Sequence, residues 1–168
     1  MKAVVLVSGG IDSAVTLAIA KEQGYEIYAL SFRYGQKHIV EFSKVPLILK
    51  DLGVINHKVI EIDSSIFDSS SLVNKNLEVP KSHNDNSIPS TYVPARNNLF
   101  LSYALSFAQN IQSSSIFIGV HLQDSPNYPD CRPEFIKKFE ELANLLTKIS
   151  IVAPLINLNK SQIVQVGI

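Results

Sequence analysis

The strongest constraint on the fold is a short apolar run that leads directly into a glycine turn. Residues 3–7 form a valine-rich, β-like run, the turn Ser8-Gly9-Gly10 follows, and apolar residues then recur at helical spacing until Gly24. Such a turn between a buried strand and a helix lets backbone N–H groups approach phosphate oxygens, and the helix N-terminus adds partial positive charge. The pattern predicts an anion-binding loop. The alternative is a tight turn with Asp12 as the helix cap.

The loop differs from the Walker phosphate-binding motif. No lysine follows the two glycines, and Asp12 and Ser13 stand where the Walker motif has lysine and serine or threonine. The sequence therefore predicts a phosphate-binding loop of another kind.

The remaining pattern alternates between strand-like and helix-like stretches. Further strands are expected at residues 27–32, 59–62, 116–120 and 149–153. A second helix is expected to end at residue 52, and further helices are expected at 97–111, 133–147 and 160–166. This alternation predicts an α/β fold: a Rossmann-like parallel sheet of about five strands with helices on both faces, and with ligands at the carboxyl ends of the strands. Residues 1–168 are expected to form a single domain.

Four details of this pattern can be checked individually. Pro46 should kink or split the second helix, because it lacks a backbone donor and clashes with the preceding turn. Residues 64–89, rich in Ser, Asn, Asp, Lys and Pro, are expected to form a long mobile loop. Asn159 should cap the last helix. The helix over 97–111 should bury one apolar face, made of Leu99, Phe100, Tyr103, Ala104, Phe107, Ala108 and Ile111.

Composition narrows the class of partner. The fifteen basic and fifteen acidic residues balance, so the overall charge gives no reason to expect nucleic acid as a partner, and a small molecule in a local pocket is favoured. The single cysteine, Cys131, excludes an internal disulfide and a multi-cysteine metal cluster within this chain. No apolar run approaches the roughly 20 residues that span a bilayer, so we expect no membrane partner and a cytoplasmic protein.

The Ser-Gly-Gly-x-Asp-Ser loop of residues 8–13, directly after the first strand, resembles that of the N-type ATP pyrophosphatases, the PP-loop superfamily. These enzymes cleave ATP between its α- and β-phosphates and transfer AMP to an oxygen. The resemblance implies an adenine nucleotide alpha hydrolase-like fold. The loop alone does not choose among the substrates of the superfamily.

Three later segments narrow the choice. Read in order, Tyr-Gly-Gln-Lys-His at 34–38, Thr-Tyr-Val-Pro-Ala-Arg-Asn at 91–97 and Tyr-Pro-Asp-Cys-Arg-Pro at 128–133 resemble the 7-cyano-7-deazaguanine synthase family of the queuosine pathway, which modifies tRNA. The resemblance runs from Met1 nearly to Ile168. It implies a ligase in which ATP adenylates the carboxylate of 7-carboxy-7-deazaguanine, ammonia displaces AMP to give an amide, and a second activation dehydrates the amide to the nitrile.

The resemblance also implies roles for individual residues, with ATP and Mg²⁺ as cofactors. Asp12, Arg96 and Lys160 are the expected catalytic residues, and Asp12 is the expected Mg²⁺ ligand. The nucleotide is expected to bind at Val7, Ser8, Gly9, Gly10, Ile11, Asp12, Ser13, Ala14, Val15, Thr16 and Leu17. The substrate is expected to contact Tyr34, Gln36, His38, Tyr92, Arg96, Tyr128, Asp130 and Arg132. The alternatives are ordinary ones: a solvated surface arginine for Arg96, an exposed helix residue for Lys160, and a rigid proline turn with a local ion pair for residues 128–133.

The cysteine and two histidines have no assigned role. Cys131 could be a nucleophile, but adenylation needs none, and a small half-buried cysteine explains it as well. His38 and His121 follow strand ends, so proton transfer, substrate orientation and structural hydrogen bonding are all open for them. His57 and His83 receive no function.

The chain departs from the family pattern at its end. Members of the family normally continue into a segment with four cysteines that bind zinc, whereas this sequence stops at Gly167-Ile168 and has none of them. We therefore expect a shortened chain. If the family forms a homodimer, its contacts are among the features that the missing segment would affect. The second hypothesis is a truncated remnant that binds ATP without completing catalysis. A third, an adenylating enzyme that acts on tRNA, is disfavoured by the neutral charge.

Overall fold

The five strands form one parallel sheet. The structure is a computed structural model that describes residues 1–36, 39–74, 76–78, 88–121, 123, 124 and 126–167. The strand order is β3-β2-β1-β4-β5, all pairs being parallel. The bounds are β1 Lys2–Leu6, β2 Glu26–Arg33, β3 Asn56–Glu61, β4 Ser115–Phe117 and β5 Ser150–Val152. The predicted α/β class and the predicted strand number are confirmed.

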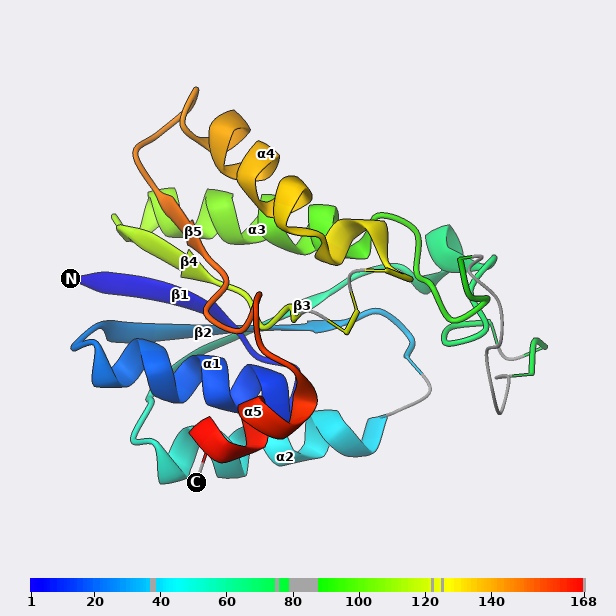
Figure 1. Cartoon of the computed structure of the whole chain (residues 1–168), viewed down its shortest axis with the longest axis horizontal. Helices are drawn as coiled ribbons and strands as arrows, with labels where there is room; N and C mark the ends of the chain where they lie inside the picture. Colours follow the sequence, from blue (N-terminus) through cyan, green and yellow to red (C-terminus); the bar gives the residue numbers. More distant parts are fainter. Residues whose placement is uncertain (37–38, 75, 79–87, 122, 125, 168) are drawn as a thin grey trace.

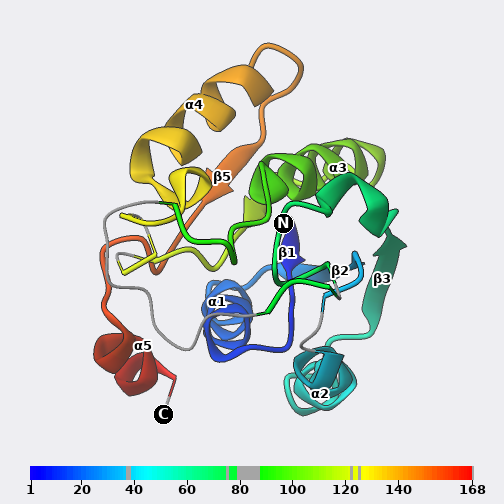
Figure 2. The ribbon, with the colours of Figure 1, turned by 90° about the vertical axis from the view of Figure 1, so that its right-hand side faces the viewer.

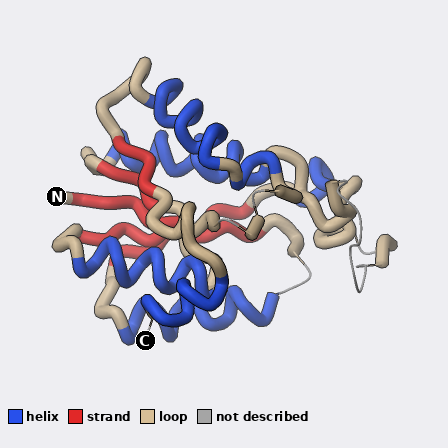
Figure 3. The backbone as a smooth tube through the Cα atoms, in the orientation of Figure 1, coloured by secondary structure: helices blue, strands red, loops and turns tan. Residues whose placement is uncertain are grey.

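Helices cover both faces of the sheet (Figures 1 and 3). On one face lie α1 (Ile11–Glu22), α2 (Ile39–Asp51) and α5 (Lys160–Val166), and on the other α3 (Arg96–Asn110) and α4 (Pro133–Ala143). Val5 of β1 packs in one core cluster with Leu17 and Val45, and its neighbour Val4 packs in the other with Leu101. Because both faces of β1 are buried, its sequence is a continuous apolar run rather than an alternating one.

The topology opens a crevice beside β1. The chain runs from β1 outward to β3 and then returns to place β4 on the other side of β1, so that Val5 pairs with both Ala29 and Phe117. The helix after β1 lies on one face, and the helix that follows β4 lies on the opposite face (Figure 2). In open parallel sheets, ligands bind at the carboxyl ends of the strands at such a point of reversal.

Three expectations about the helices need correction. The predicted buried face of residues 97–111 is wrong in part: Leu101 and Leu105 are buried although they were not included, and Tyr103 is 42% exposed. The reason is that α3 packs against both β1 and β4 and against the 3₁₀ helix η2 (Pro129–Cys131), so its buried surface wraps around the helix. The helix from Pro133 ends at Ala143 rather than near 147. Finally, α2 continues through Pro46 as one helix, so of the two expected effects, a kink or a split, the split is wrong.

The segment 64–89 is only partly the loop that the sequence predicts. Residues 64–67 form the 3₁₀ helix η1 (Ser64–Phe67), which Asp63 caps by accepting a hydrogen bond from the Ser65 amide. Phe67 and Val73 are buried, and the Ser71 amide donates to the Ser90 carbonyl at 2.8 Å. The first part of the segment is therefore packed on the core. Residues 75 and 79–87 lie outside the described residues.

The last helix begins as predicted. Asn159 accepts a hydrogen bond from the Gln162 amide at 3.0 Å, and the Gln162 side chain accepts one from the Asn159 amide at 2.9 Å. This reciprocal pair is a capping box, which satisfies amide donors that a helix start leaves free. Among the helices of the described segments, none has the length and apolar character needed to cross a bilayer.

Candidate active site

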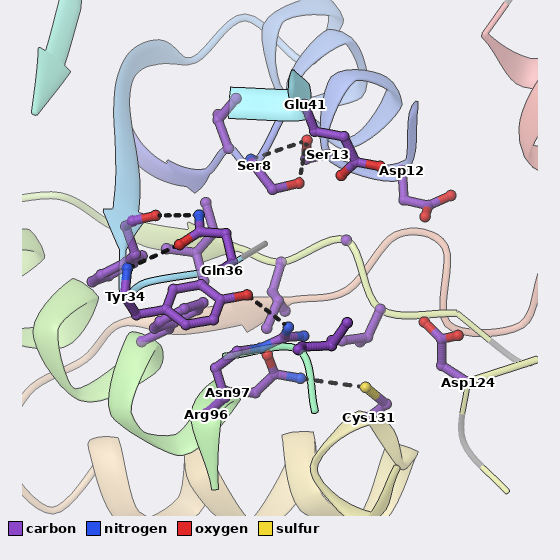
Figure 4. A pocket seen from close by; sticks show the side chains of 18 residues that line it. Ser8, Asp12, Ser13, Tyr34, Gln36, Glu41, Arg96, Asn97, Asp124 and Cys131 are labelled. Atoms are coloured by element: carbon purple, nitrogen blue, oxygen red, sulfur yellow. Dashed lines mark hydrogen bonds between the residues drawn. The ribbon is translucent and has the colours of Figure 1, made fainter. Parts of the chain in front are cut away.

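A cavity of about 300 Å³ opens at the carboxyl edge of the sheet, beside the ends of β1 and β4. Figure 4 shows two polar sides that face one another across it. We call Ser8, Asp12, Ser13 and Glu41 the loop wall, and Arg96, Asn97, Asp124 and Cys131 the opposite wall. The apolar floor between them consists of Leu6, Phe32, Tyr34, Leu72, Phe100, Ile118 and Val120.

The loop wall is held by hydrogen bonds within six residues. The Ser13 hydroxyl donates to the Gly10 carbonyl at 2.9 Å and accepts from the Ser8 amide at 3.2 Å. Gly10 is the N-cap of α1 and caps it with no side chain. The alternative in which Asp12 caps the helix is therefore wrong, because Asp12 lies within the first turn. No side-chain cap binds the amide donors of that turn, as an anion-binding helix start requires.

Two glycines allow helices to approach the loop closely. Gly9 has φ +92°, and a Cβ on it would lie 1.9 Å from the Glu41 carbonyl oxygen, so α2 could not pack where it does. A Cβ on Gly119, just after β4, would lie 3.0 Å from the Asp12 carbonyl oxygen and from the Thr16 hydroxyl. Gly9 thus brings the Glu41 carboxylate to the loop wall, and Gly119 brings α1 to the end of β4.

The strand end before the loop is anchored from the far side of β2. The buried Ser31 hydroxyl donates to the Val7 carbonyl at 2.6 Å, and His57 Nε2 lies 2.9 Å from the same hydroxyl. Because Ser31 donates its one hydroxyl proton to Val7, the His57 ring must donate to the Ser31 oxygen through Nε2. Desolvation lowers the pKa of His57, which favours the neutral ring. No function was predicted for His57, and the structure places it in this anchor.

Asp12 and Lys160 come together although 148 residues separate them. The Lys160 ammonium lies 2.7 Å from both carboxylate oxygens of Asp12. The capping box at Asn159 fixes the start of α5, and the Gln123 side chain accepts a hydrogen bond from the Lys160 amide at 3.2 Å. His121 Nε2 lies 3.7 Å from Asp12 and 3.3 Å from Asp124. The two predicted catalytic residues thus share one charged cluster with His121.

Arg96 projects from the start of α3 into the opposite wall. Ala95 before it has φ +51°, a left-handed conformation that is costly for a residue with a side chain and is typical of functional sites. Arg96 Nη1 donates to the Tyr34 hydroxyl at 3.1 Å, and the guanidinium lies 5.7 Å from the Phe100 ring centroid. Burial alone would lower the pKa of Arg96, but Tyr34 and the Asp130 carboxylate outweigh it and raise the pKa. The alternative of a solvated surface arginine is wrong.

Asp130 supports the opposite wall from behind. Its carboxylate accepts a hydrogen bond from the Asn97 amide at 2.9 Å, in the first turn of α3. Asn97 in turn donates to the Asp130 carbonyl at 3.2 Å and to Cys131 Sγ at 3.3 Å. Asp130 is buried and does not line the cavity, so its carboxylate points into the protein.

Cys131 reaches the cavity as a neutral thiol. Burial, together with the carboxylates of Asp130 and Asp124, raises its pKa to about 12. The thiolate is the nucleophilic form of cysteine, and it is absent at neutral pH with such a pKa. The geometry therefore favours the packing role for Cys131 over the nucleophile.

The other predicted substrate residues divide into two groups. Tyr34 and Gln36 line the cavity, and Gln36 accepts from the Tyr34 amide at 2.9 Å and donates to the Phe32 carbonyl at 3.2 Å. Three residues lie outside the lining: Tyr92, which accepts from the Ala95 amide, Tyr128, which bonds Thr91, and the exposed Arg132. His38 lies outside the described residues.

The predicted nucleotide residues also divide. Val7, Ser8, Asp12 and Ser13 line the cavity, and Gly9 and Gly10 shape the loop. Ile11 is exposed, and Ala14 is half-buried. Farther along α1, Val15 packs against α5, Thr16 is buried, and Leu17 lies in the core under the sheet. Of the eleven predicted residues, four thus line the cavity, and Val15, Thr16 and Leu17 do not.

Sequence reasoning missed Glu41, Asp124 and most of the floor. Asp124 carried a usable signal, because it follows a strand at the carboxyl edge of the sheet. Glu41 carried none, since it reaches the loop from another helix. Within the part of the chain that the structure describes, no three His, Cys, Asp or Glu side chains gather as a metal site.

A family model described as "Queuosine biosynthesis protein QueC" matches residues 2–168. The chain belongs to this family. A QueC-family relative, the 7-cyano-7-deazaguanine synthase of Rickettsia felis, is 53% identical over 175 residues, which cover 99% of this chain and 78% of that protein. The enzyme of the same name from Rickettsia prowazekii is 51% identical over 178 residues, with the same coverage. The predicted family is therefore confirmed.

Solved structures of other proteins share the fold of this QueC-family chain. A predicted tRNA methyltransferase subunit from Methanocaldococcus jannaschii superposes with a TM-score of 0.62 at 19% identity, covering 99% of this chain and 74% of that one. The NMN synthetase of Francisella tularensis gives 0.57 at 22% identity, covering 99% and 60%. The NH3-dependent NAD synthetase of Campylobacter jejuni gives 0.57 at 21% identity, covering 98% and 62%. At these identities the likeness establishes the fold alone.

Proposed function

We propose that this chain is an ATP-dependent carbon–nitrogen ligase that makes 7-cyano-7-deazaguanine from 7-carboxy-7-deazaguanine and ammonia. The observation that carries the proposal is the family match over residues 2–168, together with relatives named 7-cyano-7-deazaguanine synthase at 51–53% identity. The cavity supplies what that reaction needs: an anion-binding loop, an arginine and an apolar floor.

ATP is proposed to place its phosphates on the loop wall. The first-turn amides of α1 have no side-chain cap, and the Ser8 and Ser13 hydroxyls lie 3.2 Å apart at the same turn. Amide donors at a helix N-terminus favour a negative group, and a flexible lysine nearby can balance its charge. The Lys160 ammonium, paired with Asp12, is such a cation.

Asp12 fits the role of a Mg²⁺ ligand. Its side chain is 25% exposed at the cavity and offers carboxylate oxygens, the ligand type that Mg²⁺ prefers beside phosphates. A bound Mg²⁺ would neutralise charge on the phosphates during transfer. Without it, Asp12 would repel the nucleotide, so the Lys160 pair is required to offset that carboxylate.

The deazapurine is proposed to lie on the apolar floor with its carboxylate toward Arg96. Phe32 and Phe100 stack with their ring centroids 4.0 Å apart, which gives the floor a flat aromatic edge. Arg96 presents a charged guanidinium beside it, and its Nε is buried with no partner among the described residues. Guanidinium and carboxylate match in charge and geometry, and Tyr34 fixes the arginine by its hydroxyl.

The reaction then proceeds by two activations. The substrate carboxylate oxygen attacks the α-phosphorus, pyrophosphate leaves, and ammonia displaces AMP to give the amide. In the second activation the amide oxygen attacks the α-phosphorus of another ATP and pyrophosphate leaves, and the nitrile then forms as the nitrogen loses its two protons and AMP departs. The residues contribute by holding the reactants in line and by balancing charge on the departing groups.

The proposal extends to the surroundings of the enzyme. A cytoplasmic location, a homodimer and a single ATP-pyrophosphatase domain over residues 1–168 are further parts of it. Zinc belongs to the proposal only for the C-terminal segment of the family, whose four cysteines this sequence does not contain. Ammonia is the proposed nitrogen donor, and no nucleic acid is proposed as a partner. No feature of the fold or the match favours the second hypothesis of an ATP-binding remnant.

The test is direct synthesis. The purified chain is incubated with ATP, Mg²⁺, ammonium and 7-carboxy-7-deazaguanine, and the nitrile is followed by mass spectrometry. We expect nitrile and AMP only when the carboxylate substrate is present. AMP release that does not depend on 7-carboxy-7-deazaguanine, or no AMP release at all, contradicts the proposal.

A further inference from the structure

Asp124 is a carboxylate of the cavity to which no motif assigns a role. It follows β4 by a short segment, lines the opposite wall, and its side chain is 40% exposed toward the cavity side (Figure 4). Figure 4 shows it at the same end of the cavity as Asp12, across from the loop wall and away from Tyr34. A molecule bound between the loop wall and Arg96 would thus have the Asp124 side chain beside it.

The position of Asp124 is fixed by its own turn. The Asp124 amide donates to the His121 carbonyl at 3.2 Å, and the Asp124 carbonyl accepts from the amides of Asn127 and Tyr128 at 3.2 and 2.9 Å. The buried His121 ring reaches the carboxylate with Nε2 at 3.3 Å. His121 Nδ1 has no hydrogen-bond partner among the described residues, so the ring is engaged through Nε2 alone. The carboxylate is therefore held by a backbone turn and a buried imidazole.

The charges around Asp124 suit a proton acceptor. Burial raises its pKa above the ordinary aspartate value, and the Asp12 carboxylate adds to this, while His121, Lys160 and Arg96 lower it and leave the pKa raised overall. A carboxylate with a raised pKa takes a proton more readily than an ordinary one. Cys131 faces the same space but stays protonated.

The other carboxylates that line the cavity lie on the loop wall. Asp12 is bound by the Lys160 ammonium at 2.7 Å. Glu41 lies on the loop wall, and its Oε2 would be 3.5 Å from a Cβ on Gly10, so it sits beside the phosphate-binding turn. Among the described lining residues, Asp124 is the carboxylate on the side of Arg96, where the substrate carboxylate is proposed to lie.

Amide formation needs such a group. At neutral pH ammonia is mostly ammonium, which has no free electron pair and cannot attack the adenylated carboxylate. The overall step converts the acyl adenylate and ammonium into amide and AMP with release of two protons, so a base close to the acyl carbon is required.

We propose that Asp124 binds ammonium and is the general base that converts it to the attacking ammonia, an inference that rests on the proposed function. The carboxylate takes one proton, the nitrogen electron pair forms the C–N bond, and the C–O bond to AMP breaks with its electrons on the AMP phosphate. The second proton leaves the nitrogen for water once the amide has formed. His121 is a positioning residue in this scheme.

The experiment separates adenylation from ammonia attack. Asp124→Asn keeps the size and shape of the side chain and removes the base. Substrate-dependent exchange of pyrophosphate into ATP, measured without ammonium, reports adenylation, and amide plus nitrile formation with ammonium reports the full reaction. General bases contribute about 10²–10⁴-fold, so we expect the variant to keep exchange within about threefold and to lose at least about 100-fold in product formation.

The pH profile gives a second readout that a structural role would not move. Product formation by Asp124→Asn should rise about tenfold for each pH unit, because the variant depends on free ammonia. The unchanged protein should instead approach a plateau above the raised pKa of Asp124. Asp68→Asn, an exposed aspartate outside the cavity, is the matched control and should behave as the unchanged protein.

The outcomes are distinct. Pyrophosphate exchange in both the unchanged protein and Asp124→Asn, with product formation lost only in the variant, supports Asp124 as the general base. If Asp124→Asn forms product at the rate of the unchanged protein, or loses pyrophosphate exchange and product formation equally, the general-base role is overturned. Absence of exchange in the unchanged protein instead contradicts the proposed function itself.

Discussion

The loop wall and the opposite wall of the cavity are held by different kinds of contact. Hydrogen bonds within residues 8–13 shape the turn that forms most of the loop wall, to which α2 adds Glu41. The opposite wall depends on contacts between distant segments: the Asn97 amide bonds Asp130 across 33 residues, and Arg96 bonds Tyr34 across 62. A wall built by a local motif can be recognised in a sequence, and a wall built by distant contacts requires the fold.

The largest expected effect lies at the centre of the loop wall. Asp12→Ala should lower adenylation by about 10² or more, because it removes a principal group for holding charge near the phosphates. Substrate-dependent pyrophosphate exchange measures it.

A control on the same helix makes this result specific. Glu22→Ala, at the exposed end of α1, should leave exchange unchanged. If Asp12→Ala exchanges pyrophosphate at the rate of the unchanged protein, Asp12 has no role in adenylation.

The second effect tests the close approach of α2 to the loop. Gly9→Ala places a Cβ 1.9 Å from the Glu41 carbonyl oxygen and must displace the loop, so we expect KM for ATP to rise by about tenfold or more, in line with misplacement of a binding group. ATP titration of the exchange rate measures KM.

Gly24→Ala is the matched control for Gly9→Ala. Gly24 has φ +81°, similar to the +92° of Gly9, but a Cβ there meets nothing within 4 Å. Both variants carry the backbone strain of a left-handed residue, and only Gly9→Ala adds the clash. Equal KM values for ATP in the two variants would show that the approach of Glu41 does not matter.

The same contrast explains which features could be predicted from the sequence. The strand, the glycine turn and the start of α1 follow from local patterning, and Asn159 signals its capping box within four residues. The family was identified from three short segments. These features need no knowledge of the fold.

The remaining features needed the fold because their contacts are distant or indirect. Asp130 lies in a recognised segment, yet its carboxylate caps α3 instead of facing the cavity, and the sequence cannot show which way it points. Leu101 and Leu105 are buried because α3 is covered on more than one side. Glu41 reaches the loop through helix packing alone.

The third effect is on the opposite wall and concerns stability. Asp130→Ala removes the acceptor for the Asn97 amide at the start of α3, and loss of such a cap costs about 0.5–2 kcal/mol. For a chain of this size we expect Tm to fall by about 2–4 °C per kcal/mol. Asp130→Asn keeps an acceptor and should lose less, as thermal unfolding can measure. A variant Asp130→Ala that unfolds at the unchanged temperature would contradict the cap.

The smallest effect is expected at Cys131. Its pKa of about 12 leaves the thiol protonated from pH 6 to 9, so it supplies no nucleophile and no titration in that range. Cys131→Ser should change product formation by no more than about threefold, through packing alone. Loss of activity by two orders of magnitude, or rapid alkylation of Cys131 at pH 7, would contradict the packing role.

The central claim is that one cavity carries out two successive adenylations of the same substrate carbon. The ratio of AMP to nitrile, measured by mass spectrometry after the reaction has gone to completion, tests it most directly. The account predicts two AMP for each nitrile formed from 7-carboxy-7-deazaguanine, and one when the amide is supplied in its place. One AMP for each nitrile from the carboxylate would contradict it.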